Sequence, residues 1–173
     1  MDEIKLVEKA KNGHTMSLNF LLEENYIPLY AFLVKMIGNQ ELAKDITQDA
    51  MVKAVTNIKK FRGDSKFSSW LIRIGINTYK NYVKKNKVNT ELLDYNTVSN
   101  HNVEDEMLKK SQWNKVVEKL KDVKEPDRTI FILKYYEGYG YQEIAYITGV
   151  KIGTCKSKMH YLINKLRQEL EGS

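Results

Sequence analysis

The stretch FRGDSKFSSWLIRIGIN, residues 61–77, contains a turn followed by the start of an amphipathic helix. Residues 62–65, Arg-Gly-Asp-Ser, favour a turn, and the Ser65 hydroxyl is predicted to cap the next helix. Apolar residues then recur at three- and four-residue spacing on one helical face: Phe67, Trp70, Leu71 and Ile74. Because this spacing recurs along the chain and no run alternates with period two, the sequence predicts an all-α protein.

Residues that start and stop helices divide the region before this stretch. Asp2 is predicted to cap a short first helix that ends before Gly13. Ser17 is predicted to cap a long apolar segment that ends before Gly38, and Pro28 is expected to kink this segment or split it in two. A further amphipathic helix follows Asn39, with these core candidates: Leu42, Ala43, Ile46, Ala50, Val52 and Ile58.

The pattern changes after residue 86. Residues 87–103 show no sustained helical period and are predicted to form a linker, after which acidic residues 104–106 open another helix. Pro126 suits the first turn of the following helix, which is predicted to stop at Gly138.

Residues 141–167 fit a helix-turn-helix. Ala145 provides the small residue where the second helix crosses the first, and Gly149 suits the turn because glycine tolerates a positive φ. The second helix is predicted to be held by apolar residues at Val150, Ile152 and Cys155. Its outward face would offer polar and aromatic side chains to a DNA major groove: Thr154, Lys156, Ser157, Lys158, His160 and Tyr161. A plain helical hairpin is the alternative interpretation.

The net charge of +6 is concentrated in the N-terminal half, where residues 1–86 carry 14 basic and 9 acidic side chains. In residues 59–87, Asp64 is the one acid among nine basic residues, and aromatic residues are interleaved with them. Cations that neutralise phosphates beside rings that stack on bases are typical of single-stranded nucleic acid sites. A solvated basic helix whose rings are core is the alternative.

No catalytic constellation is found in the sequence. The three histidines lack metal-ligand spacing, and neither a glycine-rich phosphate loop nor a nucleophile elbow is present, so no catalytic residue, metal or cofactor is predicted. Asp45 and Asp49 lie one helical turn apart, which favours an acidic face for a protein partner over a metal site. The single Cys155 fits a reducing cytosol, and neither a secretion signal nor a membrane-spanning run is expected.

Three motifs carry a resemblance to a known family. They are LAKDITQDA at residues 42–50, the 61–77 stretch, and YYEG at residues 135–138 together with the helix-turn-helix. With these motifs, residues 16–169 resemble the extracytoplasmic-function group of bacterial sigma factors, the alternative specificity subunits of RNA polymerase.

The resemblance implies two small helical domains on a flexible linker. Residues 1–86 would be sigma region 2, residues 87–104 the linker, and residues 105–173 sigma region 4. The first domain would bind the β′ clamp helices of core RNA polymerase and read the minus-10 promoter element as a melted strand. The second would contact the β flap and read the minus-35 element as duplex. An anti-sigma factor, either free or membrane-bound, would control this cytoplasmic protein, which has no catalysis of its own and does not insert into the membrane.

Site residues follow from the family motifs by position. Core polymerase would contact Leu42, Asp45, Ile46, Gln48, Asp49 and Lys53. The minus-10 strand would contact Arg62, Lys66, Phe67, Ser68, Ser69, Trp70, Arg73, Asn77, Lys80, Asn81 and Lys84, with residues 66–69 as a loop that holds a flipped base. The minus-35 duplex would contact Arg128, Thr154, Lys156, Ser157, Lys158, His160 and Tyr161. Trp70 fits a core role as well as a stacking role.

The chain departs from the family at two of these positions. Lys158 and Tyr161 stand where the family often has arginine, so the bidentate fork that reads guanine is missing and no minus-35 consensus is carried over. Two other functions explain only part of the sequence. A dimeric helix-turn-helix regulator leaves the basic aromatic stretch unexplained, and an RNA-binding enzyme accessory leaves the helix-turn-helix unexplained.

Overall fold

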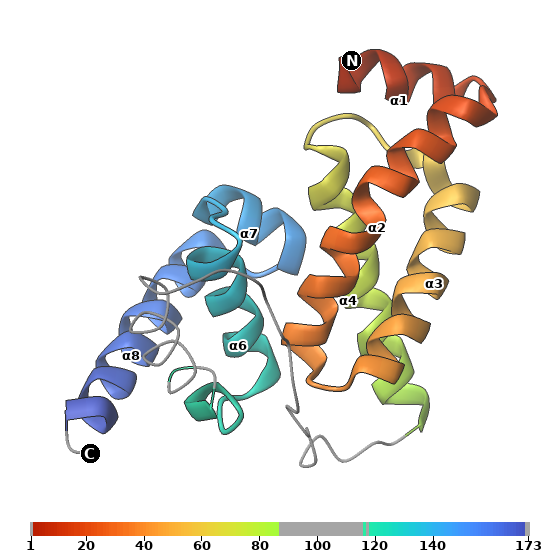
Figure 1. Ribbon diagram of the computed structural model, residues 1–173. Coiled ribbons are helices and arrows are strands. Elements are labelled where there is room, and N and C mark those ends of the chain that lie inside the picture. The colour runs from red at the N-terminus through yellow and green to blue at the C-terminus, as the bar shows by residue number, and fades with distance from the viewer. Residues whose placement is uncertain (1, 87–115, 117, 172–173) are drawn as a thin grey trace, which may run out of the picture.

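The computed structural model describes residues 2–86, 116 and 118–171, and every regular element in those residues is helical (Figure 1). The predicted all-α fold with two helical units is therefore confirmed. We call residues 2–86 the N-terminal unit and residues 118–171 the C-terminal unit. The predicted linker, residues 87–104, lies outside the described residues.

The N-terminal unit is built around α2. Its elements are α1 (Glu3–Lys11), α2 (Thr15–Ile37), α3 (Gln40–Asn57), the 3₁₀ turn η1 (Ile58–Lys60) and α4 (Phe67–Asn86). Helices α1, α3 and α4 all pack against α2. Helix α4 approaches α2 closely at Gly75, where an added Cβ would lie 3.1 Å from Leu29 Cδ1. The α3 core prediction was wrong at Val52, which is exposed because it lies on the opposite face from Ala50 and Ala54.

The predicted cap at Asp2 is confirmed, the predicted cap at Ser17 is wrong, and the structure adds a cap at Asn39. Asp2 Oδ1 accepts a hydrogen bond from the Ile4 N–H at 3.1 Å, and Asn39 Oδ1 accepts one from the Leu42 N–H at 2.9 Å. Helix α2, however, is capped by His14 Nδ1, which accepts a hydrogen bond from the Ser17 N–H at 3.2 Å. Ser17 itself lies inside the first turn.

Pro28 does not split α2, which is continuous from Thr15 to Ile37. Proline removes one backbone donor and so leaves the carbonyl four residues earlier, at Glu24, without its helical partner. Both Pro28 and Glu24 lie on the exposed side of α2, where water can satisfy that carbonyl.

The start of α4 also differs from the sequence prediction. Lys66 occupies the cap position, because its carbonyl accepts from the Trp70 N–H, so Ser65 lies one residue too early to cap the helix. The first N–H of α4, on Phe67, instead donates to Glu3 Oε1 at 3.0 Å. A carboxylate from α1 therefore caps a helix that begins 64 residues later in the chain.

The C-terminal unit contains the predicted helix-turn-helix. Its elements are α6 (Glu125–Phe131), the π-helical turn η2 (Ile132–Tyr136), α7 (Tyr141–Thr148) and α8 (Ile152–Glu171). Gly138 and Gly149 adopt φ values of +76° and +74° where helical segments end. Cys155 is fully buried against the rest of this unit, but Ile152 is 38% exposed, so its predicted role in holding α8 was wrong. No helix in the described part of the chain is long and apolar enough to cross a bilayer.

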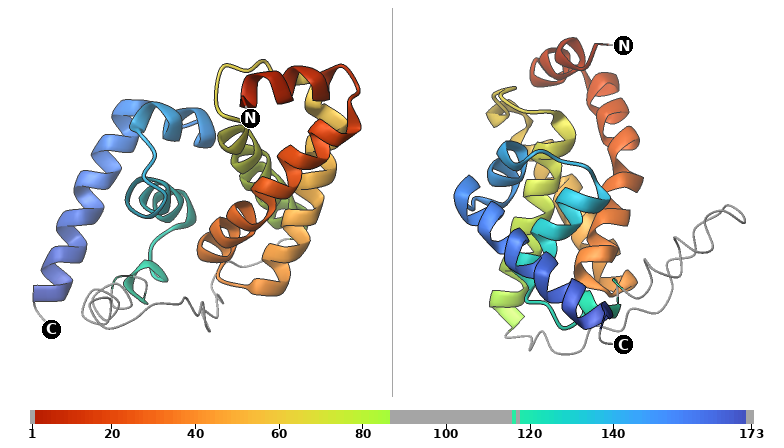
Figure 2. Two further views of the ribbon diagram at one scale, coloured as in Figure 1. Left: turned by 45° about the horizontal axis from the view of Figure 1, so that its top comes forward. Right: turned by 90° about the vertical axis from the view of Figure 1, so that its left-hand side faces the viewer.

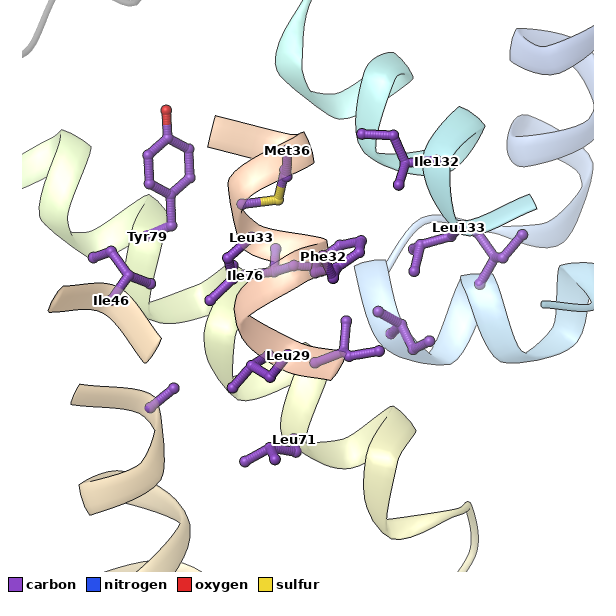
Figure 3. Close-up of a cluster of buried hydrophobic side chains, with 14 of the residues drawn as sticks. Leu29, Phe32, Leu33, Met36, Ile46, Leu71, Ile76, Tyr79, Ile132 and Leu133 are labelled. Atoms are coloured by element: carbon purple, nitrogen blue, oxygen red, sulfur yellow. The ribbon is translucent and has the colours of Figure 1, made fainter. Parts of the chain in front are cut away.

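The two units pack against each other, with α4 beside α7 and α2 beside α6 and η2 (Figure 2). Their buried apolar residues form one continuous cluster. In that cluster Phe32 of α2 faces Leu133 of η2, and both are fully buried (Figure 3). The apolar core therefore extends from one unit into the other.

Candidate nucleic-acid interface

The polar face of α4 brings most of the predicted minus-10 residues together. A stripe of exposed side chains follows the helical repeat along it: Arg73, Asn77, Lys80, Asn81 and Lys84. The opposite face packs into the core through residues that include Leu71 and Ile76, each 1% exposed. The alternation of apolar and basic positions thus fixes which way the cations point.

A cavity of about 440 Å³ lies beside this stripe, between the end of α3, the 61–64 turn and α4. Five residues predicted from the sequence line it: Arg62, Trp70, Arg73, Asn77 and Asn81. Further polar and aromatic groups that sequence reasoning did not assign to the minus-10 surface also line it: Lys53, Asn57, Lys60 and Tyr146. Cations, side-chain amides and aromatic rings are the groups that bind phosphates, base edges and base faces.

Trp70 is both a core residue and a cavity residue. Its ring lies 4.9 Å from the Phe61 ring and 5.5 Å from the Phe67 ring, centroid to centroid. The side chain nevertheless remains partly exposed and lines the cavity. The core and stacking roles are therefore compatible.

The predicted base-holding loop at residues 66–69 is not a loop in this structure. Residues 67–69 form the first turn of α4, and the side chains of Phe67 and Ser69 are fully buried. In this arrangement neither side chain is accessible to a strand, because the aromatic cluster and the neighbouring helices cover them. Lys66 is exposed and Ser68 is half-buried.

The predicted polymerase face of α3 divides into exposed and buried residues. Asp45, Gln48 and Asp49 are exposed, whereas Ile46 is only 1% exposed and belongs to the core. Leu42 is half-buried. Lys53 points towards α4, where its Nζ donates to Thr78 Oγ1 at 3.0 Å, and it lines the cavity described above.

The outward face of α8 presents the predicted minus-35 side chains. Five of them are exposed: Thr154, Lys156, Ser157, His160 and Tyr161. Lys158 is instead ion-paired with Asp127 of α6. Arg128 is only 3% exposed, and its Nη1 donates to the Val123 carbonyl at 3.3 Å. The structure therefore gives Arg128 a place inside the C-terminal unit and away from the outward face.

The C-terminal unit also contacts the polar face of α4. The Arg73 guanidinium carbon lies 4.9 Å from the centre of the Tyr146 ring. The Tyr139 phenol lies beside the hydroxyls of Ser68 and Ser69. Burial raises the pKa of this phenol above its ordinary value of 10.0, and the two serine hydroxyls oppose that shift.

A polar contact holds the other edge of the same interface. Lys35 Nζ of α2 lies 3.1 Å from Glu137 Oε1, with both side chains mostly buried. The same ammonium lies 3.6 Å from the centre of the Tyr136 ring. No group of three or more potential ligands among the described His, Cys, Asp and Glu side chains could hold a metal ion.

Comparison with known proteins identifies both units. Residues 21–88 match the family model for sigma-70 region 2, and residues 114–161 match that for sigma-70 region 4. The chain is also 30% identical to the ECF RNA polymerase sigma-E factor of Escherichia coli strain K12, over 89% of this chain and 86% of the relative. The chain belongs to the ECF family of RNA polymerase sigma factors. It is thus a transcription-initiation protein of the alternative sigma factor class.

Other members support the assignment over nearly the full length. The chain is 28% identical to the ECF RNA polymerase sigma factor SigW of Bacillus subtilis strain 168, over 96% of this chain and 95% of the relative. Among solved structures, the sigma factor RpoE from Bartonella quintana, crystallised with the anti-sigma factor NepR, matches with a TM-score of 0.68 at 24% identity. That match covers 91% of this chain and 96% of the solved chain, and it shows a shared fold.

Proposed function

We propose that this sigma factor reads the minus-10 promoter element as a melted strand along α4 and the adjoining cavity. The observation that carries the proposal is the combination of the basic stripe Arg73–Lys84 with a cavity lined by Trp70 and several amides. Lysines and arginines neutralise strand phosphates, while an aromatic ring stacks on an unpaired base for about 1–3 kcal/mol.

Capture of an unpaired base also explains how the protein would favour melting. Unpairing and unstacking one base costs a few kcal/mol, and a site that accepts only the extruded base recovers part of that free energy. Asn57, Asn77 and Asn81 line the cavity with side-chain amides that can donate to and accept from base edges. Phe67 and Ser69 are left out of this proposal because they are buried.

The minus-35 element is proposed to bind α8 as duplex. Lys156, His160 and Tyr161 are exposed on the outward face, and the second helix of a helix-turn-helix enters the major groove in this way. Lys158 would join them only after leaving Asp127, so we assign it a smaller share of the binding.

Core RNA polymerase is proposed to contact the exposed acidic face of α3 at Asp45, Gln48 and Asp49. Two carboxylates on one exposed helical stripe suit a basic partner surface, here the β′ clamp helices. The C-terminal unit would contact the β flap. An anti-sigma factor, in some cases membrane-bound, would control the protein, as the inhibitor-bound RpoE structure suggests for this fold. The protein would act in the cytoplasm without catalysis of its own.

Transcription with purified core RNA polymerase tests the proposal. Arg73→Ala should lower run-off transcription from duplex promoter fragments about tenfold, since losing one strand contact of about 1.4 kcal/mol changes binding tenfold. Co-purification with core polymerase should stay unchanged. Lys9→Ala removes an equal charge from the exposed face of α1 and is the matched control.

The result that would contradict the proposal is equally direct. If the Arg73→Ala protein supports as much run-off transcription as the Lys9→Ala protein, α4 does not read the promoter. A chain that shifts duplex promoter DNA equally well without core polymerase would favour the dimeric regulator instead.

A further inference from the structure

Lys158 belongs to the outward part of α8, but its charge is directed towards another helix of the same unit. Thr154, Lys158 and Tyr161 are four and three positions apart, so they lie on one row along α8. Thr154 is exposed, and Tyr161 is 73% exposed. The Lys158 ammonium instead pairs with the Asp127 carboxylate of α6, which packs beside α8 (Figure 1). The central cation of this row is therefore held by α6.

The surroundings of Asp127 make Lys158 its cationic partner. Asp127 lies in the first turn of α6, where the helix dipole favours a negative charge. The neighbouring Arg128 side chain is directed elsewhere, since its Nη1 donates to the Val123 carbonyl at 3.3 Å. The Lys158 and Asp127 side chains are 36% and 30% exposed, so water and salt screen their attraction less than that of a fully exposed pair.

We propose that Asp127 is a positioning residue for the minus-35 interaction, which withholds the Lys158 ammonium from the DNA phosphates. The inference rests on the proposed binding of duplex DNA by α8. A phosphate that approached Lys158 would either displace it from Asp127 or lie beside the Asp127 carboxylate, and each of these events costs electrostatic free energy. Asp127 itself touches no DNA in this scheme and acts through Lys158.

The consequence is weaker binding to every duplex, whatever its sequence. Phosphate contacts carry no direct sequence information, whereas contacts to base edges do. Lys156, His160 and Tyr161 remain exposed for the groove, while Lys158 is kept from the phosphates. The protein would then spend less of its time on bulk DNA and more of it available to core RNA polymerase.

A salt titration of duplex binding by the full-length chain tests the proposal. The probe is a fluorescein-labelled duplex of arbitrary sequence, followed by anisotropy between about 50 and 200 mM salt. Each additional phosphate that a cation neutralises makes the slope of log K against log salt more negative by about 0.9. Asp127→Asn should therefore steepen the slope by about 0.9 and raise the affinity about fivefold near 0.1 M salt. Asp122→Asn removes an equal charge from an exposed position of the same unit, and as the matched control it should leave the slope unchanged.

A second set of variants shows whether the effect passes through Lys158. In a Lys158→Ala chain, Asp127→Asn should leave the slope unchanged, because no ammonium is released. A purely structural role of the ion pair predicts a different result, since Asp127→Asn would then loosen α6 from α8 and weaken binding without steepening the slope. Loss of folding would also weaken binding, so it cannot imitate the expected result.

The outcomes separate this inference from the proposed function. If Lys156→Ala leaves duplex affinity unchanged, α8 does not bind the duplex and the proposed function of this helix fails. If Lys156→Ala lowers the affinity but Asp127→Asn keeps the wild-type slope, the inference is overturned. A slope that steepens equally with and without Lys158 overturns it as well. A steeper slope that requires Lys158, together with the loss caused by Lys156→Ala, supports both.

Discussion

Helices α4 and α8 are alike in sequence pattern but differ in what lies on their polar faces. Each has 20 residues, with an apolar face in its own unit and a basic face turned outward. The α8 face leaves Tyr161 73% exposed, whereas Tyr146 of α7 lies over Arg73 on the α4 face. A basic amphipathic pattern thus predicts which face of a helix points outward, but not whether another part of the chain contacts that face.

The two helices also start differently. Helix α8 follows a local turn in which Thr148 Oγ1 accepts from the Val150 N–H at 3.2 Å. Helix α4 depends on Glu3, far away in the sequence, for the partner of its first N–H. A substitution at Glu3 in α1 can therefore weaken the start of α4. Helix α8, whose start depends on local contacts, serves as the reference helix in the same protein.

The largest effect should come from removing the apolar contact that holds the two units together. Leu133→Ala should lower the free energy of unfolding by about 2–5 kcal/mol, because it leaves a cavity at a fully buried position. Chemical denaturation followed by circular dichroism measures the change. Leu170→Ala, at a position 36% exposed on α8, is the control and should stay within about 0.5 kcal/mol of wild type.

A smaller effect should follow from removing the cap of α4. Glu3→Ala should lower the free energy of unfolding by about 1 kcal/mol, since it leaves the Phe67 N–H without its carboxylate acceptor. Glu3→Gln retains an acceptor oxygen and should recover part of the loss. Hydrogen exchange checks the location, because the substitution should speed exchange at the first amides of α4. A larger increase over wild type in α8 than in α4 would contradict a role for Glu3 at this helix start.

The smallest effect concerns Tyr139 in alkaline solution. Because burial raises the pKa of its phenol above 10.0, the folded protein favours the neutral form. The stabilisation is complete below the unfolded pKa of about 10 and is lost as pH rises through the higher folded pKa. Tyr139→Phe should therefore lose less stability than wild type between neutral pH and pH values above 10. An identical loss in both proteins would show that this phenol is not buried by the interface.

Local sequence patterns predicted the face of α4 well. The spacing of Arg73, Asn77 and Lys84 against Leu71 and Ile76 is enough to sort outward from inward positions. The same periodicity predicted Ile46 as a core residue, on the stripe of Ala43 and Ala50 that α2 and α4 cover, and its burial confirms this; the family motif assigned it to polymerase contact instead. Family motifs mix contact residues with core residues, so position in a motif did not separate them.

What the sequence did not predict are the contacts between distant segments. Glu3 reaches Phe67, and Tyr146 reaches Arg73, through packing that no local pattern encodes. Arg128 is also buried, at 3% exposed, and its hydrogen bond to the Val123 carbonyl lies within the C-terminal unit. Ser65 is predicted as a cap because serine favours that position. In the structure, however, the Glu3 carboxylate from α1 accepts the first N–H of α4.

The cap that Glu3 provides has a consequence for the order of synthesis. Glu3 is synthesised before Phe67, whose N–H it accepts from, and the two residues are 64 positions apart. At ordinary translation rates of about 5–20 residues per second, the delay between them is about 3–13 s. The N-terminal unit then completes its own contacts before the C-terminal unit exists. A ribosome-bound nascent chain would therefore display α4 without α7 beside it, a state that the finished protein reaches only when its two units part.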